Sequence, residues 1–262
     1  MDPRSKKIRE DILKISQASG HGHIPTCFSV VELIQGVYDT MNHRCNDPKW
    51  QQRDIFILSK GHAALGLYCT LAHAGYFPIE DVYRFGAFHS KFGCHADRSK
   101  VPGVEASTGS LGHGIGIAVG VAMGFKIQKS KRRVYTLIGD GESNEGTVWE
   151  SIMVAANQGL DNLTIIFDDN DSQTRCQPIS NPLRRFEAFD CNAVEADGHN
   201  LDNLKKAFEV APDGRPKVIV ANTQKGYGCG SLVRDKFAWH RRSPNEDELK
   251  KLLEELNDAN YR

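Results

Sequence analysis

Apolar residues follow two alternating patterns along the chain, short continuous runs and runs with helical spacing. The continuous runs indicate buried strands at residues 54–59, 134–138, 163–167, 193–196 and 217–221. Helical spacing predicts helices at residues 3–19, 30–37, 61–74, 111–129, 144–157, 201–208 and 245–256. Asp2 and Pro3 open the first helix and Gly20 ends it, while Ser29 is expected to cap the second. The alternation predicts an α/β fold, with a parallel central sheet and helices on both faces.

Two stretches depart from this alternation. Residues 78–104 have little periodicity and many polar residues, which predicts a long ordered loop that carries function rather than core. The helix at 111–129 has one nearly bare side, made by Gly112, Gly114, Gly116, Gly120 and Gly124. Such a face permits close packing against sheet, cofactor or another subunit. No repeat or linker divides the chain, so we expect a single domain over residues 1–262.

Composition excludes several classes of function. The 33 basic residues balance 33 acidic ones, which gives no reason to propose nucleic acid or an anionic membrane as partner. The start lacks an apolar signal-type core and no run is long enough to span a bilayer, so we expect a cytoplasmic protein. Seven cysteines without a CxxC pair are typical of reduced thiols, and Cys94 and Cys229 are interpreted as small packing residues.

An acidic and an amide residue stand at the ends of two strand-type runs. Asp140 and Asn170 are separated by the length of one strand–helix–strand crossover, so their side chains can converge at one edge of a parallel sheet. Carboxylate, amide and carbonyl oxygens suit Mg²⁺ or Ca²⁺. Gly139 and Gly141 let the main chain approach a diphosphate. A tight Gly-Asp-Gly turn without any ligand is the alternative for the tripeptide alone.

With these residues in place, the chain resembles the thiamine diphosphate enzymes, and among them the transketolases. Gly139–Gly141 followed by Asp169–Asn170 resembles the thiamine diphosphate motif. Further stretches stand in the order of the transketolase family: Ser19–His21, Ser59–His62, Gly93–His95, Pro102–Gly112 and Lys225–Gly228. The resemblance runs from about residue 8 to 244, and it covers only the N-terminal, diphosphate-binding part of a full-length transketolase.

The resemblance implies a set of site residues. Asp140 and Asn170 would give side-chain oxygens, and Ser172 its main-chain carbonyl, to Mg²⁺, for which Ca²⁺ or Mn²⁺ can substitute. Thiamine diphosphate would be held by His62, Gly109, Ser110, Leu111, Gly139, Asp140, Gly141, Glu142, Asn170 and His240. The catalytic histidines would be His21 and His95 on the substrate carbonyl and hydroxyls, with His62 and His240 on the diphosphate side.

Other histidines have no matching context. We interpret His43, His73 and His199 as surface or loop residues, and His23 and His89 as near the site only in sequence. By residue type alone, His21, His23 and His62 could bind zinc, but cysteine or carboxylate ligands at suitable spacing are missing.

Some positions differ from the family pattern or have two readings. Trp239–Pro244 carries Arg241 and Arg242 where the family commonly has His-Gly-x-x-Pro. They could bind a phosphate, sulfonate or carboxylate tail, or be solvated residues ahead of the last helix. Ser19–Ile24 reads Ser-Gly-His-Gly-His-Ile instead of Ser-Gly-His-Pro-Gly. Glu145 matches an interface glutamate of the family, or it favours the start of a helix.

The resemblance also implies missing parts, because the family's pyrimidine-binding domain would follow this segment. We therefore expect a split transketolase in which this chain needs a C-terminal partner subunit, as a heterotetramer acting on small sugars. Ketol transfer from a ketose, in particular a sugar phosphate, to an aldose is the expected reaction. The alternatives are another thiamine diphosphate enzyme, similar to deoxyxylulose phosphate synthase or dehydrogenase E1, and a non-catalytic assembly subunit.

Overall fold

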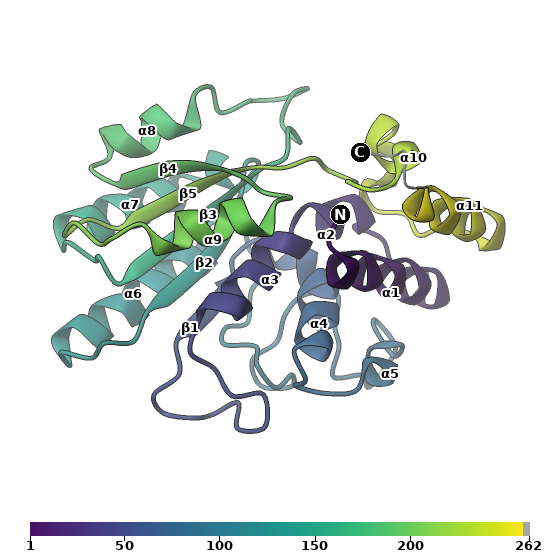
Figure 1. Cartoon of the computed structure of the whole chain (residues 1–262), viewed down its shortest axis with the longest axis horizontal. Helices are drawn as coiled ribbons and strands as arrows, with labels where there is room; N and C mark the ends of the chain where they lie inside the picture. Colours follow the sequence, from purple (N-terminus) through teal and green to yellow (C-terminus); the bar gives the residue numbers. More distant parts are fainter. Residues whose placement is uncertain (259–262) are drawn as a thin grey trace.

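A five-stranded parallel sheet forms the centre of the protein, in a computed structural model that describes residues 1–258. The strand order is β1-β2-β3-β5-β4 (Figure 1). The strands are β1 (Ile55–Leu58), β2 (Val134–Gly139), β3 (Leu163–Asp169), β4 (Asn192–Asp197) and β5 (Lys217–Asn222). All four neighbouring pairs are parallel. The predicted parallel α/β fold is confirmed.

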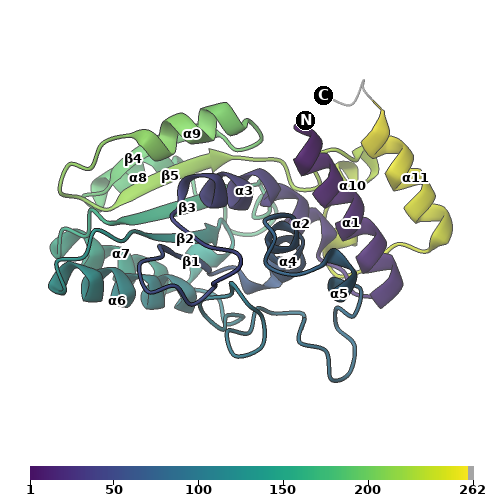
Figure 2. The same cartoon turned by 60° about the horizontal axis from the view of Figure 1, so that its bottom comes forward.

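Helices cover both faces of the sheet, as Figure 2 shows. One face packs against α3 (Val31–Thr40), α4 (Ala64–His73) and α9 (Leu201–Glu209). The other packs against α6 (His113–Ile127), α7 (Gly146–Asn157) and α8 (Pro182–Ala188). Strand side chains alternate between the two cores, so that Phe56 and Leu58 enter the first while Ile55 and Ile57 enter the second. Burial on both faces explains why these strands are continuous apolar runs.

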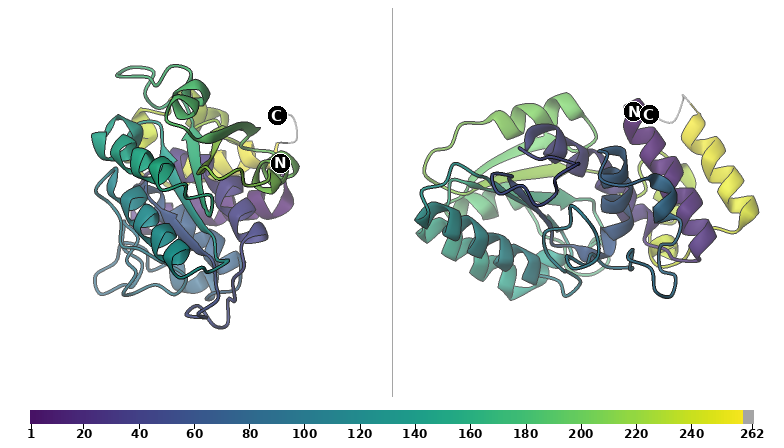
Figure 3. Two further views of the ribbon diagram at one scale, coloured as in Figure 1. Left: turned by 90° about the vertical axis from the view of Figure 1, so that its left-hand side faces the viewer. Right: turned by 90° about the horizontal axis from the view of Figure 1, so that it is seen from below.

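Further helices gather beyond the end of the sheet at which the chain leaves β5 (Figure 3). They are α1 (Pro3–Ser19), α2 (Ile24–Ser29), α5 (Ile79–Val82), α10 (Gly230–Arg234) and α11 (Glu246–Asn257). Three 3₁₀ turns complete the described elements: η1 (Gly61–Ala63), η2 (Glu142–Asn144) and η3 (Ala238–His240). Helices α1 and α11 contact each other, as do α2 and η3. The first and last parts of the described chain therefore meet beside the carboxyl ends of the strands. Within residues 1–258, no helix is long and apolar enough to cross a membrane.

The ends of the first helix agree with the sequence, and the start of the next does not. Asp2 caps α1 and Gly20 ends it in a left-handed conformation with φ of 70°. Ser29, however, is the last residue of α2, and α3 begins after Val30 without a side-chain cap. The Ser29 hydroxyl is buried and donates to Asp168 at 2.8 Å. The predicted cap at Ser29 is wrong because a distant carboxylate takes its hydroxyl.

Residues 78–104 contribute more to the core than the sequence suggested. Apart from α5 this segment is irregular, yet its apolar side chains are buried in the first core, at Val82, Phe85, Phe92, Ala96, Val101 and Val104. The expectation of a loop that carries function rather than core is therefore wrong in part. The sequence did not predict these buried positions, because an irregular segment can bury side chains at any interval and shows no helical or strand period. The short helices α8 and α10 were likewise not predicted.

Candidate functional site

Asp140 and Asn170 follow directly after β2 and β3, and their side chains converge. The two strands pair in register, with Gly139 opposite Asp168. The main-chain amide of Ser172 donates to both side chains, at 2.7 Å to Asp140 Oδ2 and 3.1 Å to Asn170 Oδ1. The thirty-residue crossover therefore brings these oxygens to one point at the carboxyl edge of the sheet, as their spacing predicts.

The Asn170 side chain is held in one orientation. Its amide nitrogen donates to Asp168 Oδ2 at 2.8 Å and to the Ser29 hydroxyl at 3.3 Å. Because only the NH₂ group can donate, these contacts turn the Asn170 oxygen toward Asp140. Supporting hydrogen bonds of this kind commonly fix the ligands of a metal ion.

Asp168 lies beneath this point and joins four segments of the chain. Its carboxylate is fully buried and accepts hydrogen bonds from Ser29, Lys60, Asn170 and Thr223. Burial alone would raise the pKa of Asp168, but the Lys60 charge and these hydrogen bonds outweigh burial and hold the pKa below its usual value. Asp168 was not predicted as a site residue, since its apolar strand gives no sign of the partners that other segments bring.

Glu142 organises the main chain on the other side of Asp140. Its carboxylate accepts from the Ser59 hydroxyl at 2.5 Å and from the amides of Gly112 and Gly139 at 2.9 and 3.1 Å. Burial, the largest influence, raises the pKa of this carboxyl. Glu142 thus ties the end of β1, the start of α6 and the end of β2 together. Its contacts support the glycine-flanked turn.

Three histidine rings cluster above the strand ends. The ring centroids of His23 and His62 are 5.5 Å apart, those of His23 and His240 5.2 Å, and those of His62 and His240 6.2 Å. The interpretation that His23 is near the site only in sequence is therefore wrong. Its left-handed backbone, with φ of 68°, is a local conformation that spacing could not reveal.

These rings are neutral at pH 7. Burial is the largest cause and lowers the pKa of His62 to about 2, with the Lys60 charge as the next cause. Burial likewise lowers the pKa of His23 and of His240 to about 4. Each ring can therefore offer one N–H donor and one acceptor nitrogen.

Two lysines bring positive charge to the same place. Lys60 and Lys225 are 2% and 5% exposed, and Lys225 Nζ lies 3.4 Å from His240 Nδ1. Burial, followed by the Lys60 charge, lowers the pKa of Lys225 to about 8. Both lysines stand in stretches that resemble family motifs, but no role was predicted for either. The available signal was a lysine directly before a glycine in each stretch, Lys60–Gly61 and Lys225–Gly226. A buried lysine needs a polar partner.

His21 and His95 lie on neighbouring loops. His21 Nδ1 is 3.5 Å from Cys94 Sγ, and a Cβ on Gly86 would overlap the His21 ring. A Cβ on Gly109 would lie 3.1 Å from the His95 ring. The 109–111 loop, expected beside the cofactor, is therefore next to His95.

The remaining histidines are not all surface residues. His199 stacks on Tyr227 with ring centroids 3.7 Å apart, and its Nδ1 lies 3.1 Å from Glu32 Oε2. His199 lies in the turn after β4, as a loop residue, but it is not a surface residue, since these contacts join it to the interior. His73 Nε2 similarly contacts Asp11 at 2.8 Å.

Residues 1–258 contain no group of three or more His, Cys, Asp or Glu side chains placed to hold a metal, which contradicts the zinc alternative from His21, His23 and His62.

The donor set fits a divalent cation with a diphosphate. Asp140 and Asn170 present oxygen atoms, which hard cations prefer. The two buried lysines and the histidine N–H groups lie nearby and suit an anion that carries several negative charges. Asp140 at present accepts hydrogen bonds from Gly141, Ser172 and Gln173. A cation would compete with these donors for the same oxygens.

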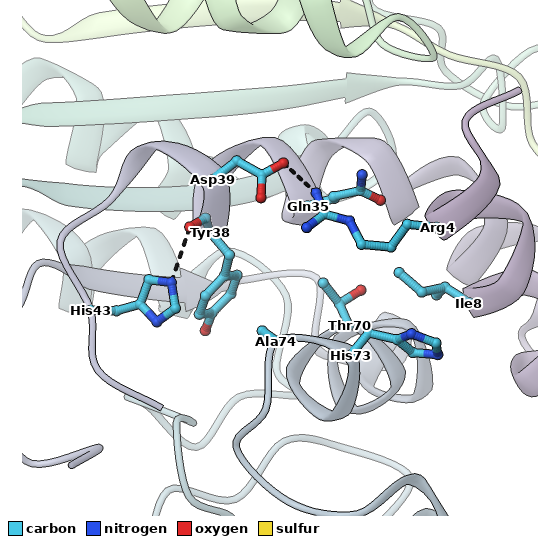
Figure 4. Close-up of a pocket in the computed structure, with 9 residues that line it drawn as sticks. All are labelled: Arg4, Ile8, Gln35, Tyr38, Asp39, His43, Thr70, His73 and Ala74. Carbon is cyan, nitrogen blue, oxygen red and sulfur yellow. Dashed lines mark hydrogen bonds and ion pairs between the residues drawn. The ribbon is translucent and has the colours of Figure 1, made fainter. Parts of the chain in front are cut away.

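A separate cavity of about 290 Å³ lies between α1, α3 and α4 (Figure 4). Its polar side chains contact one another or nearby groups: Arg4 pairs with Asp39, and a His43 ring nitrogen lies 3.1 Å from the Tyr38 carbonyl. None of the strand-end residues described above lines this cavity. Its polar groups therefore call for no ligand.

Comparison with known proteins identifies the family. Residues 5–258 match the family described as transketolase, thiamine diphosphate binding domain. The chain is 40% identical to one of the subunits of the apulose-4-phosphate transketolase of Actinobacillus succinogenes, over 98% of this chain and 96% of that protein. It is 37% identical to the 6-deoxy-6-sulfo-D-fructose transketolase subunit SqwG of Clostridium sp. strain MSTE9, over 95% and 93% of the two chains.

Solved structures agree with this match. The crystal structure of transketolase from Campylobacter jejuni superimposes with a TM-score of 0.89 at 29% identity, covering 97% of this chain and 42% of that one. Transketolase from Leishmania mexicana gives a TM-score of 0.85 at 27% identity, over 97% and 40%. This chain thus spans about two fifths of the length of the solved transketolases. The chain belongs to the transketolase family and corresponds to its thiamine diphosphate-binding domain.

Proposed function

We propose that this chain is the cofactor-binding subunit of a two-subunit transketolase. In this proposal the enzyme transfers a two-carbon ketol unit from a ketose, of the sugar-phosphate class, to an aldose acceptor. The observation that carries the proposal is the nearly end-to-end match with two relatives that are named as transketolase subunits.

The residues at the strand ends would hold the cofactor. Asp140, Asn170 and the main-chain carbonyl of Ser172 would bind Mg²⁺. The main chain at Gly139, whose amide donates to Glu142, and at Gly141, whose amide donates to Asp140, would face the diphosphate. When bound, thiamine diphosphate supplies the carbon nucleophile that neither the protein nor the metal can provide.

The histidines and Lys225 divide between cofactor and substrate in this proposal. His62 and His240 are neutral at pH 7 and would donate N–H hydrogen bonds on the diphosphate side. Lys225, beside His240, would add a positive charge there. His21 and His95 would contact the substrate carbonyl and hydroxyls and move protons between them. Main-chain groups of Gly109, Ser110 and Leu111 would lie along the aminopyrimidine.

An uncovered apolar face supports the need for a partner. Ile117 and Ile127 on α6 are 43% and 75% exposed, and Met153 and Val154 on the adjacent α7 are 51% and 43% exposed. Nothing in the described chain lies within 4 Å of a Cβ built on Gly120 or Gly124 of α6. A smooth apolar face of this kind suits an obligate contact, which typically buries about 2,000 Å² or more. We propose that the C-terminal transketolase subunit covers it, in a heterotetramer.

Reconstitution tests the proposed function. The purified chain alone should show negligible ketol transfer. Mixed with a C-terminal transketolase subunit from the same organism, thiamine diphosphate and Mg²⁺, it should release an aldose from a ketose donor. Pyruvate and other 2-oxo acids, offered as donors in parallel, test the related thiamine diphosphate enzymes. Robust turnover by the chain alone, or turnover only with a 2-oxo acid, would overturn the assignment.

Binding of the cofactor separates a catalytic from an assembly subunit. The complex should bind thiamine diphosphate in a Mg²⁺-dependent manner in calorimetry. A complex that assembles but binds no cofactor would identify this chain as a non-catalytic assembly subunit.

A further inference from the structure

The two adjacent arginines after His240 have different environments. The Arg242 guanidinium stacks on Trp239, 3.6 Å from the ring centroid, and bonds to Glu248 at 2.7 and 3.1 Å. Arg242 therefore anchors the start of α11 and is a solvated structural residue. Arg241 differs: within residues 1–258 its guanidinium forms no hydrogen bond, ion pair or aromatic contact. Both arginines are exposed, but Arg242 has protein partners, whereas Arg241 has none among residues 1–258 and is available to a ligand.

The backbone places Arg241 against the histidine loop. A Cβ built on Gly22 would overlap both the carbonyl carbon and the carbonyl oxygen of Arg241. Because these are backbone atoms, no side-chain rotation could relieve the clash. Only glycine at position 22 allows the two segments to approach so closely.

Two departures from the transketolase pattern are therefore physically linked. Gly22 stands where the family commonly has proline, and Arg241 stands where it commonly has glycine. The segments are more than two hundred residues apart in sequence, yet they meet at this contact. Because the contact involves the main chain of residue 241, Gly22 brings that main chain against the loop of His21 and His23, whichever side chain residue 241 carries.

The surroundings of Arg241 favour an anionic ligand. It follows His240 directly, and His240 contacts both His23 and Lys225. After burial, the Arg241 charge is among the causes that lower the pKa of His23 and His240, which is consistent with its position beside these rings. A cation next to neutral histidines and a lysine, without a carboxylate partner, suits an incoming negative charge. The guanidinium group matches the planar pairs of oxygens on phosphate, sulfonate and carboxylate groups.

We propose that Arg241 is a specificity-determining residue that receives the anionic tail of the sugar substrate beside the histidine cluster. The inference rests on the proposed transketolase function. It assigns the substrate class, sugars with a phosphate, sulfonate or carboxylate group, to a residue of this chain. Gly22 is the positioning residue that lets the main chain of Arg241 lie against the histidine loop.

The test uses the reconstituted two-subunit complex with matched substrates. Ketoses that carry a phosphate, a sulfonate, a carboxylate or a neutral hydroxyl at the same carbon are compared by kcat/KM. The variants are Arg241→Gln, Arg241→Lys and, as the matched control, Arg242→Gln. Arg241→Gln should reduce the preference for the anionic over the neutral ketose by roughly 10- to 100-fold, chiefly through KM. Arg241→Lys should retain part of it, and Arg242→Gln should stay within about two-fold of the wild type.

The three anionic ketoses show which tail the site accepts. The ketose whose kcat/KM falls most in Arg241→Gln carries that tail. A loss of equal size for neutral and anionic ketoses would overturn the proposal. So would an equal effect of Arg242→Gln, weaker thiamine diphosphate binding by Arg241→Gln, or weaker assembly with the partner subunit. These last two outcomes would assign Arg241 to the cofactor or to the interface.

A binding experiment keeps this inference separate from the proposed function. Calorimetric binding of the same ketoses to the complex requires no turnover. If no ketose turns over, the proposed function fails, but an anion preference that disappears in Arg241→Gln would still support the role of Arg241. If turnover occurs and the preference is unchanged in Arg241→Gln, the role of Arg241 fails alone.

Discussion

Lys60 and Asp168 form a buried ion pair beneath the two strand ends, with Lys60 Nζ 2.5 Å from Asp168 Oδ2 and side chains 3% and 0% exposed. The same Asp168 oxygen accepts the Asn170 amide that orients the proposed metal ligand. The pair therefore connects the interior of the sheet to the chemistry at its edge. Its energetic role follows from burial, because a charge left without its partner there cannot be solvated.

Replacing Asp168 with alanine should destabilise the protein by about 3–5 kcal/mol, because Lys60 would remain buried and unpaired. Urea unfolding followed by circular dichroism measures the change. The exposed pair of Lys91 and Asp81, with atoms 2.9 Å apart, provides the control, and Asp81→Ala should cost about 0–1 kcal/mol. A loss below about 1 kcal/mol in Asp168→Ala would show that water reaches Lys60.

Sequence spacing located the strand-end residues because they depend on short-range regularity. Asp140 and Asn170 follow apolar strands one crossover apart, and parallel pairing then places them together. The cap and the stop of α1 are likewise local, since Asp2 and Gly20 act within one turn of the helix. Patterns of this kind were sufficient for the sheet, the main helices and the centre of the candidate site.

Contacts between distant segments could not be predicted. Ser29 was assigned to a helix cap, but Asp168, 139 positions away, accepts its hydroxyl. His23 joins His240 only because η3 folds back against α2. The Gly22 contact with Arg241 has the same origin. Such contacts depend on the order of the strands and the paths of the loops, which one sequence without periodic signals does not specify.

The proposed metal ligands should differ in their tolerance to substitution. Asp140→Ala should remove most of the Mg²⁺-dependent binding of thiamine diphosphate by the complex, because a carboxylate ligand is lost. Ser172→Ala is the matched control, since its main-chain carbonyl remains and only a hydroxyl contact with Asp140 disappears. We expect it to bind within about three-fold of the wild type, which corresponds to less than about 1 kcal/mol. Calorimetry with and without Mg²⁺ measures both, and equal losses in the two variants would contradict the assignment.

Acid should destabilise the isolated chain through the buried histidines. The folded pKa of His62 is about 2 against an ordinary value of 6.5, so below pH 6.5 the unfolded state takes up a proton that the folded state does not. The contribution of His62 to the free energy of unfolding is therefore fully present above pH 6.5. It falls as the pH drops, by at most about 1.4 kcal/mol per pH unit. Asp169, whose pKa burial raises to about 6, acts in the opposite direction. Comparison of the wild type with His62→Gln isolates the histidine contribution.

Urea unfolding between pH 7 and pH 5 should give a smaller loss of stability in His62→Gln than in the wild type. Parallel curves for the two proteins would mean that His62 is protonated in the folded state. The same measurements on His43→Gln, outside the cluster, control for the loss of an imidazole elsewhere in the chain.

Alkaline pH should weaken cofactor binding through Lys225. Its pKa of about 8 means that the free site loses this charge as the pH rises through 8, and the diphosphate must then bind without it. Affinity should fall above pH 8 by up to about ten-fold per pH unit, the limit for one linked proton. The histidines, with pKa values of about 2 to 4, are neutral throughout and add no slope. Titrations of the complex at pH 7, 8 and 9 measure this slope. Lys225→Met should bind thiamine diphosphate more weakly than the wild type and should not show the slope.

The bare side of α6 gives a test in which folding and assembly change in opposite directions. Gly120 is exposed, and nothing in the described chain lies within 4 Å of a Cβ at this position. Gly120→Leu should therefore stabilise the isolated chain by about 0.5–1 kcal/mol through better helix propensity. In the complex, the new side chain would enter the face proposed to pack against the partner and should weaken assembly at least about ten-fold, since overpacking costs about 1–3 kcal/mol.

Lys205→Leu, exposed on α9 across the sheet, adds the same side chain elsewhere and should leave assembly unchanged. Sedimentation of the mixed subunits decides the matter, because undiminished assembly of Gly120→Leu would remove α6 from the interface.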